Sequence, residues 1–114
     1  MKKNIIVVTG GAGFVGSNLI KKLLEYQNYK IISIDNYSSG FKKNHIRNKR
    51  IKYINEDTKN INFKLNKIKN RIDSIFHFGE FARIYQSFKQ FDKCYDSNTI
   101  GSKAVFKFCL DNKI

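Results

Sequence analysis

The sequence predicts an α/β domain in which helices cover both faces of a doubly wound parallel sheet. Short β-branched runs of strand length alternate with segments whose apolar residues recur at helical spacing. The first run breaks into glycines and restarts at once as a helix, a junction that brings bare backbone N–H groups to one point. With 114 residues, 41% of them apolar, the chain has room for one packed domain.

The first strand, helix and second strand are expected within residues 3–35. We predict a strand over 3–9, because four consecutive β-branched residues bounded by glycine suit a sheet that is covered on both faces. From Phe14 to about Tyr26, apolar residues recur every three or four positions and predict an amphipathic helix. Residues 31–35 follow as a second buried strand, which completes one βαβ unit.

The remaining elements follow a loop at residues 36–40. We predict strands over 51–55 and 74–78, and helices over 63–70 and 92–111. The expected strand order is 3-2-1-4, the N-terminal half of a doubly wound sheet. This order leaves the fourth strand at an apolar edge that is prone to pairing with another chain.

The glycines after the first strand match a dinucleotide-binding fingerprint. Gly11-x-Gly13-x-x-Gly16 has a strand before it and a helix after it, which is the context that the fingerprint requires. An acidic residue should follow about 20 positions later, at the end of the second strand, to accept hydrogen bonds from the ribose. Asp35 stands 19 residues beyond Gly16. Its carboxylate would repel a 2′-phosphate, so these residues predict a Rossmann-type domain that binds NAD rather than NADP.

Several segments together resemble the extended short-chain dehydrogenases, specifically the N-terminal part of the NAD-dependent nucleotide-sugar epimerase/dehydratase family. Residues 9–19 look like the opening of that family, and residues 35–40 are similar to the ribose-binding loop of its UDP-glucose 4-epimerase branch. Residues 57–58 fall where the family places side chains against the adenine ring. Residues 76–79 look like the fourth-strand segment that usually ends in His-x-Ala-Ala, and residues 98–102 match an Asn-x-x-Gly-Thr helix start.

This resemblance implies a cofactor, a substrate class and a set of contact residues. In the full-length enzymes a hydride passes between NAD and a carbon of a nucleotide sugar, in an epimerase or a dehydratase reaction. No metal is implied. The cofactor-binding residues that the resemblance implies are Gly10, Gly13, Phe14, Val15, Gly16, Asp35, Asn36, Ser38, Gly40, Asp57, Thr58, Phe78, Gly79, Glu80 and Asn98.

Three positions depart from the pattern of the family. Glu80 and Phe81 stand where small or aliphatic residues are usual, which puts a negative charge close to the expected phosphates. Ala82 occupies the place of a Lys that often contacts the cofactor, although Arg83 is adjacent. We therefore expect the affinity for the pyrophosphate to differ from that of the family.

The catalytic residues of the family are expected to lie outside this chain. The resemblance implies a Ser or Thr, a Tyr general base and a Lys four residues later, on a fifth strand and the helix after it. Residues 111–114 look like the lead-in to that strand. We therefore expect residues 1–114 to be a truncated NAD-binding domain without its substrate domain, so that enzymatic activity of the chain itself stays an open question.

Other residues with catalytic potential are given structural interpretations. Tyr26 with Lys30, and Tyr85 with Lys89, have the Tyr-x-x-x-Lys spacing, but neither pair follows a fifth strand with a Ser or Thr. We expect His77 to be a packed ring. No Ser/His/Asp grouping is expected around either histidine.

The cysteines and the distribution of apolar residues bear on location. Cys94 and Cys109 have no spacing typical of a zinc site or a disulfide framework, and we predict that both are small buried apolar groups. No apolar stretch has the length of a membrane span, and the N-terminus does not resemble a signal peptide. These features predict a cytoplasmic protein without a membrane partner.

The charge leaves two alternative functions open. The chain has 22 Lys and Arg against 9 Asp and Glu, a net charge of +13, and residues 42–52 form a concentrated basic run. One alternative is a nucleic-acid-binding protein that acts through this basic run. The glycine fingerprint makes this alternative the least favoured of the functions considered. A non-catalytic NAD-binding module is the other. A homodimer is an open expectation for the full-length protein.

Overall fold

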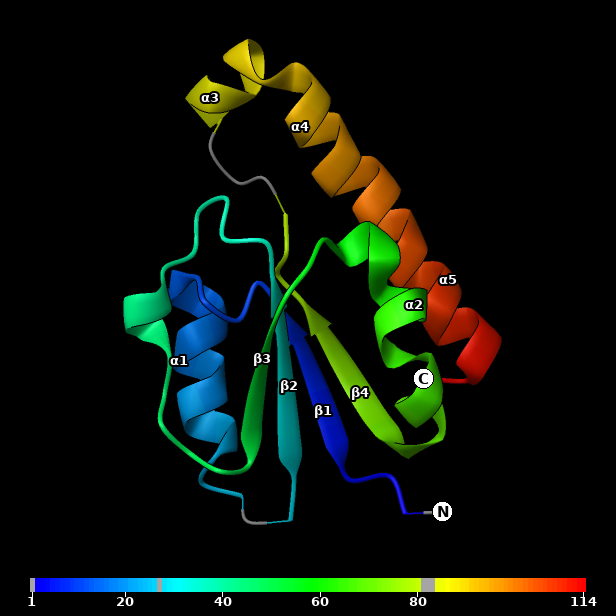
Figure 1. Ribbon diagram of the computed structural model, residues 1–114. Coiled ribbons are helices and arrows are strands. Elements are labelled where there is room, and N and C mark those ends of the chain that lie inside the picture. The colour runs from blue at the N-terminus through cyan, green and yellow to red at the C-terminus, as the bar shows by residue number, and fades with distance from the viewer. Residues whose placement is uncertain (1, 27, 81–83) are drawn as a thin grey trace.

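The computed structural model describes residues 2–26, 28–80 and 84–114, and the side chains of 84–86 are outside this description. Four strands form one parallel sheet in the order β3-β2-β1-β4 (Figure 1). The strands are β1 (Ile5–Thr9), β2 (Lys30–Asp35), β3 (Ile51–Asn55) and β4 (Ile72–His77). The predicted order is confirmed, and so is the α/β class.

The helices are α1 (Phe14–Leu23), α2 (Ile61–Leu65), α3 (Ile84–Lys89), α4 (Phe91–Tyr95) and α5 (Ser102–Asn112). A π-helical segment over residues 96–101 joins α4 to α5, so the helix predicted over 92–111 forms as one nearly continuous rod (Figure 1). The helix predicted over 63–70 is wrong in type beyond α2, because residues 66–71 form a 3-10 helix. That stretch lacks the apolar stripe that would hold a longer α-helix against the sheet.

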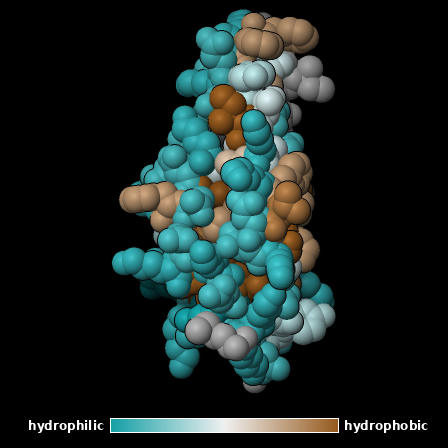
Figure 2. All heavy atoms as spheres, turned by 90° about the vertical axis from the view of Figure 1, so that its right-hand side faces the viewer, coloured by the Kyte–Doolittle hydropathy of each residue, from teal (hydrophilic) through white to brown (hydrophobic). Residues whose placement is uncertain are grey.

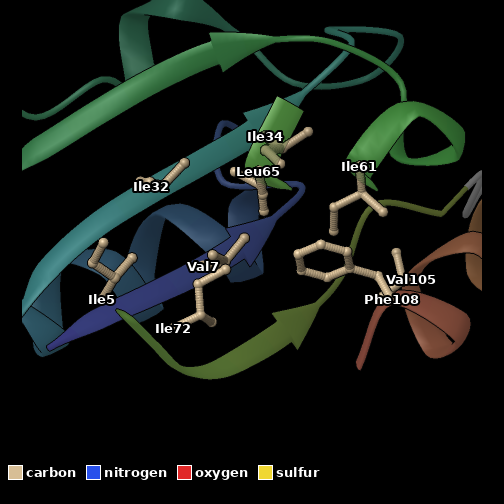
Figure 3. Packing of buried hydrophobic residues seen from close by; sticks show 9 residues of the cluster. All are labelled: Ile5, Val7, Ile32, Ile34, Ile61, Leu65, Ile72, Val105 and Phe108. Carbon is tan, nitrogen blue, oxygen red and sulfur yellow. The ribbon is translucent and has the colours of Figure 1, made fainter. Parts of the chain in front are cut away.

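The two faces of the sheet are covered by different helices (Figure 1). Alternate residues of β1 point to opposite faces, and all five of its residues are buried. Val8 and Ile6 pack with Ile20 of α1 on one face. Helices α2 and α5 close the other face, over the larger core cluster (Figure 3). That cluster comprises Ile5, Val7, Ile32, Ile34, Ile61, Leu65, Ile72, Val105 and Phe108.

Strand β4 lies at one edge of the sheet and pairs only with β1 among the described strands. Phe76 and Phe78, in and just after this strand, are more than a third exposed. Seen from the α5 side, hydrophobic side chains interrupt a mostly hydrophilic surface (Figure 2). The apolar edge predicted for the fourth strand is thus present in the fold.

The basic run from Lys42 to Lys52 is largely a structured connection between β2 and β3. It contains a 3-10 turn, a loop and the first residues of β3. The guanidinium group of Arg50 donates hydrogen bonds to main-chain carbonyls of Leu24, Tyr26 and Tyr29, at and beyond the end of α1. Cationic side chains suit these carbonyls because the C-terminal end of a helix carries negative partial charge. Arg50 therefore has a structural role, which weakens the nucleic-acid interpretation of the run.

Both cysteines are free and only half-buried, so their predicted burial is wrong in degree. Cys109 packs against the larger core cluster from α5, and this partial burial raises the pKa of its thiol. Among the described residues, no helix combines the length and hydropathy that a bilayer span requires, and no group of three His, Cys, Asp or Glu side chains is placed to hold a metal ion.

Candidate functional site

A cleft of about 510 Å³ opens at the carboxyl ends of the strands. Its lining comes from the segments that follow all four strands and from the start of the α4–α5 rod. Parallel sheets of this kind bind ligands at this end, beside the point where the chain reverses its direction of winding, which here lies between β1 and β4. The volume is in the range of small-molecule and cofactor sites.

The glycine turn brings main chain and helix end together at the cleft. Gly10 has φ of +72°, and a Cβ there would lie 2.7 Å from the carbonyl oxygen of Phe78. A Cβ on Gly16 would lie 2.2 Å from the carbonyl oxygen of Gly10, so the first turn of α1 rests directly on the glycine turn. Helix α1 has no side-chain cap and no acidic residue in its first turn. Its free N–H groups and positive end are therefore available to an anion.

Asp35 closes β2 and is nearly buried, with 9% of its surface exposed. Its Oδ2 accepts a hydrogen bond of 3.0 Å from the N–H of Ala12, and its Oδ1 accepts one of 2.8 Å from the N–H of Tyr37. A Cβ on Gly40 would lie 2.7 Å from Oδ2. The carboxylate thus ties the glycine turn to the loop over residues 36–40, and it also lines the cleft.

The loop over residues 36–40 is connected to the end of β3 as well. The side chain of Asn36 donates a hydrogen bond of 2.7 Å to Asp57 Oδ1, and its own Oδ1 accepts one of 3.0 Å from the N–H of Ser38. Thr58 follows Asp57 and is buried beneath Gly79 and Gly101, where a Cβ would lie within 3.0 Å of its side chain. The floor of the cleft is therefore built from close contacts between segments distant in sequence.

A hydrogen-bonded chain crosses the β4 end of the cleft. Thr9 Oγ1 accepts the N–H of Gly79 at 2.9 Å, which leaves its hydroxyl proton for His77 Nδ1, 2.6 Å away. His77 Nε2 then carries the proton that bonds Ser102 Oγ at 2.8 Å, and Ser102 donates to Glu80 Oε1 at 3.4 Å. Burial lowers the pKa of His77, while the charge of Glu80 opposes that shift.

Ser102, His77 and Glu80 form a group that contains a Glu in place of an Asp, so it is not the Ser/His/Asp grouping considered for the two histidines. It lacks the arrangement of a nucleophilic triad, because Nδ1 of the imidazole bonds a threonine hydroxyl and Ser102 is only 7% exposed. The prediction that His77 is a packed ring agrees with these contacts.

The cleft is acidic although the whole chain is strongly basic. Five carboxylates line it against two lysines, Lys59 and Lys93. Lys59 pairs with Asp96 across 3.1 Å, and this partner raises the pKa of the ammonium group. Hydrogen bonds from Asn60 and from the N–H of Asp57, with a smaller contribution from Lys64, lower the pKa of Glu56. An anionic ligand here would have to rely on main-chain N–H groups and the end of α1.

Ten of the fifteen predicted cofactor residues line the cleft: Gly10, Gly13, Asp35, Asn36, Ser38, Asp57, Thr58, Phe78, Gly79 and Glu80. Five do not line it. Phe14 and Val15 project from the first turn of α1, Gly16 and Gly40 are buried beneath the turn and the loop, and Asn98 lies on the α4–α5 rod. The side chain of Asn98 donates to Cys94 Sγ at 3.5 Å.

Eight lining residues were not predicted: Ile34, Ser39, Asn55, Glu56, Lys59, Lys93, Asp96 and Ser97. Most of these residues lie in or directly beside a predicted segment, so the predicted ends of β2 and β3 already indicate this part of the cleft. Lys93, Asp96 and Ser97 reach the cleft from the α4–α5 rod, for which no local pattern existed. Phe81, Ala82 and Arg83, of which Phe81 and Ala82 depart from the family pattern, lie outside the described residues.

The two Tyr-x-x-x-Lys spacings lie on different elements. Lys30 begins β2 opposite Ile5, at the amino ends of the strands, so the pair with Tyr26 lies at the end of the sheet away from the cleft. Tyr85 and Lys89 lie on α3, and the side chain of Tyr85 is outside the described ones. The interpretation of that second pair as a chance spacing stays a prediction.

The sheet order, the glycine turn and the cleft define a Rossmann-type dinucleotide-binding domain. Residues 6–114 match the model of the NAD dependent epimerase/dehydratase family. Because this match covers nearly the whole chain, the chain belongs to that family, as the resemblance implied.

Individual relatives are similar over the same region. ADP-L-glycero-D-manno-heptose-6-epimerase of Brachyspira hyodysenteriae is 32% identical over 96% of this chain and 35% of its own length. A UDP-N-acetylglucosamine 4-epimerase from Methanobrevibacter ruminantium, solved with UDP-N-acetylmuramic acid, is 32% identical with a TM-score of 0.84, over 100% of this chain and 36% of that one. The Bordetella bronchiseptica enzyme WbmF, solved with NAD+, is 25% identical with a TM-score of 0.85, over 95% and 32%. The chain thus spans about a third of the length of these relatives.

Proposed function

We propose that the chain binds NAD in this cleft, with the adenosine diphosphate portion against the glycine turn. The observation that carries the proposal is the uncapped N-terminus of α1, which faces the cleft beside the Asp35 carboxylate. The uncapped main-chain N–H groups in the first turn of α1 would receive the pyrophosphate. The ribose hydroxyls would donate to Asp35, whose two oxygens already hold Ala12 and Tyr37 in place.

The fit is supported by close approaches between the main-chain segments that line the cleft. Gly10 and Gly79 line the cleft and let neighbouring segments pack closely beneath it, since a Cβ at either position would meet another segment within about 3 Å. Asn36 and Asp57 are connected by a hydrogen bond of 2.7 Å and would face the ribose and the adenine. Phe78 and Glu80 stand at the β4 end of the cleft, which would face the pyrophosphate and the nicotinamide ribose.

We further propose that this domain is the NAD-binding portion of a nucleotide-sugar epimerase or dehydratase. Bound NAD would supply reversible hydride transfer at a sugar carbon. The described residues of this chain bind and orient, and none of them is assigned a proton-transfer role. Relatives about three times as long act on or bind nucleotide sugars by name, which supports a nucleotide sugar as the substrate of the whole protein. A cytoplasmic location is part of this proposal, and the free cysteines are consistent with a reducing compartment.

Calorimetric titration of the 114-residue chain with NAD tests the binding proposal. We expect measurable heat and a rise in melting temperature with NAD, and weaker effects with NADP, because Asp35 would repel a 2′-phosphate. Absence of heat and of any melting shift at millimolar NAD would refute binding by this domain. Equal responses to NAD and NADP would refute the role given to Asp35.

A homodimer is a second part of the proposal, and the α4–α5 rod supports it. Phe91, Tyr95, Phe106 and Leu110 are each more than half exposed along that rod, and exposed apolar side chains of this size favour burial against a partner. Sedimentation equilibrium of the chain with Phe106→Lys and Leu110→Lys should show a lower dimer fraction than the unchanged chain. Tyr26→Lys is a matched control, because Tyr26 is 57% exposed just beyond α1, and α1 covers the opposite face of the sheet from α5.

A further inference from the structure

Tyr37 has a main-chain conformation that an aromatic residue seldom adopts. Its φ of +61° lies in the left-handed region, which is unfavourable for a side chain with a Cβ. Such a conformation persists only where surrounding contacts enforce it, and it is found most often at ligand sites and switches. Tyr37 stands between Asn36 and Ser38, which both line the cleft. The contacts that hold it are therefore relevant to the site.

Two hydrogen bonds hold Tyr37 in this conformation. Its N–H donates to Asp35 Oδ1 at 2.8 Å, and its hydroxyl lies 2.7 Å from His45 Nε2. Burial, and then the charge of Asp35, raise the pKa of the Tyr37 phenol, so the hydroxyl keeps its proton in this contact.

His45 in turn rests on the sheet. Its ring stacks on that of Tyr53, with centroids 3.8 Å apart and planes 8° from parallel. Tyr53 belongs to β3, where it lies opposite Ser33 of β2, and its hydroxyl accepts a hydrogen bond of 2.8 Å from the N–H of Ile46. The contacts therefore run from a rigid strand, through two stacked rings, to the strained residue of the loop.

We propose that Tyr37, His45 and Tyr53 form an aromatic clasp that holds residues 36–40 in the geometry that the adenosine ribose of NAD requires. This inference rests on the proposed function. The three side chains are positioning residues, since none is among the described residues that line the cleft. The clasp holds the loop through the Tyr37 side chain, while Asp35 and Asp57 hold it by hydrogen bonds from the Tyr37 N–H and the Asn36 side chain. Without the clasp, the loop would have to order itself at the expense of binding energy.

The test measures NAD and ADP-ribose binding by calorimetry in Tyr37→Phe and His45→Ala. Tyr37→Phe removes only the hydroxyl, and His45→Ala removes both the hydrogen bond and the stack. We expect each to weaken both ligands by about three- to tenfold, the effect of one hydrogen bond of ordinary net strength. Tyr53→Phe keeps the stack and is expected to bind more tightly than Tyr53→Ala. Tyr26→Phe is the matched control, because Tyr26 is exposed at the other end of the sheet.

Hydrogen exchange of main-chain amides separates positioning from general stability. In His45→Ala, exchange at Ser38, Ser39 and Gly40 should accelerate, while that at Val7 and Val8 in β1 should stay unchanged. If the unchanged chain binds neither ligand, the proposed function fails and the clasp has no role in NAD binding. If it binds both and the variants bind equally well, the clasp is refuted while the proposed function stands. Acceleration that includes β1 to the same degree would also refute positioning, because it would show a general loss of stability.

Discussion

The main-chain N–H of Ala12 donates a hydrogen bond of 3.0 Å to Oδ2 of Asp35, 23 residues away. This bond joins the glycine turn after β1 to the end of β2 in a nearly buried place. The carboxylate that would receive the ribose in the proposed function thus also determines where the glycine turn lies. We therefore expect binding and stability to be coupled at this residue.

Asp35→Asn should lower both NAD affinity and stability. The amide presents only one acceptor oxygen, so one of the N–H groups of Ala12 and Tyr37 loses its partner, at a cost of about 1–3 kcal/mol in the free energy of unfolding. We expect NAD affinity to fall about tenfold and the preference over NADP to shrink, as measured by calorimetry and urea denaturation. Asp73→Asn, in an exposed position of β4, is the control. An unchanged preference would contradict the electrostatic account.

The glycines at positions 13 and 16 should respond differently to alanine. A Cβ on Gly16 would lie 2.2 Å from a main-chain oxygen, whereas on Gly13 the nearest contact is 3.3 Å. Gly16→Ala is expected to lower the free energy of unfolding by about 1–3 kcal/mol through overpacking. Gly13→Ala should leave stability within about 1 kcal/mol and mainly weaken NAD binding. Thermal melts and titrations of both variants check this, and equal destabilisation would show that the contact distances do not decide the outcome.

Much of this site could be predicted because its signals are local. The glycine cluster, its strand-to-helix context and Asp35 lie within one βαβ unit, and the sheet order follows from the same alternation of elements. The aromatic clasp had no such signal, because Tyr37, His45 and Tyr53 lie in loops and a weakly alternating strand without periodic spacing. Their contact depends on the path of the chain between β2 and β3.

The helical elements after β3 could also be predicted only in part from the sequence. Residues 66–71 are polar or charged except for Ile68, so they carry no helical pattern of apolar residues. Ile68 packs against the larger core cluster, and this tertiary contact decides the conformation of the segment. Lys93 and Asp96 reach the cleft because the α4–α5 rod extends past the strand ends (Figure 1). Contacts of this kind between distant segments produce no pattern in the local spacing of residues.

Glu80→Gln should strengthen NAD binding. Glu80 adds a carboxylate to an already acidic cleft, and it would lie near the pyrophosphate. Gln removes the charge and keeps an oxygen that can accept from Ser102. We expect the affinity to rise about three- to tenfold at low salt, with a smaller gain at high salt because ions screen the repulsion. Glu25→Gln, an exposed change in the ion pair with Lys22, should have no effect. Equal affinity in both variants would place the Glu80 charge too far from the phosphates to matter.

The stability of the chain should depend on pH through His77. Burial lowers the pKa of this imidazole in the fold, so as the pH falls the unfolded chain takes up a proton before the folded chain does. The free energy of unfolding should therefore be highest above about pH 7, decline as the pH falls through the ordinary histidine pKa of about 6.5, and level off below the lowered pKa. His77→Gln should flatten this decline between pH 5 and 8 in urea denaturation. Glu80→Gln should deepen it, because the charge that opposes the shift is gone. A decline of the same size in His77→Gln would assign the pH dependence to other groups.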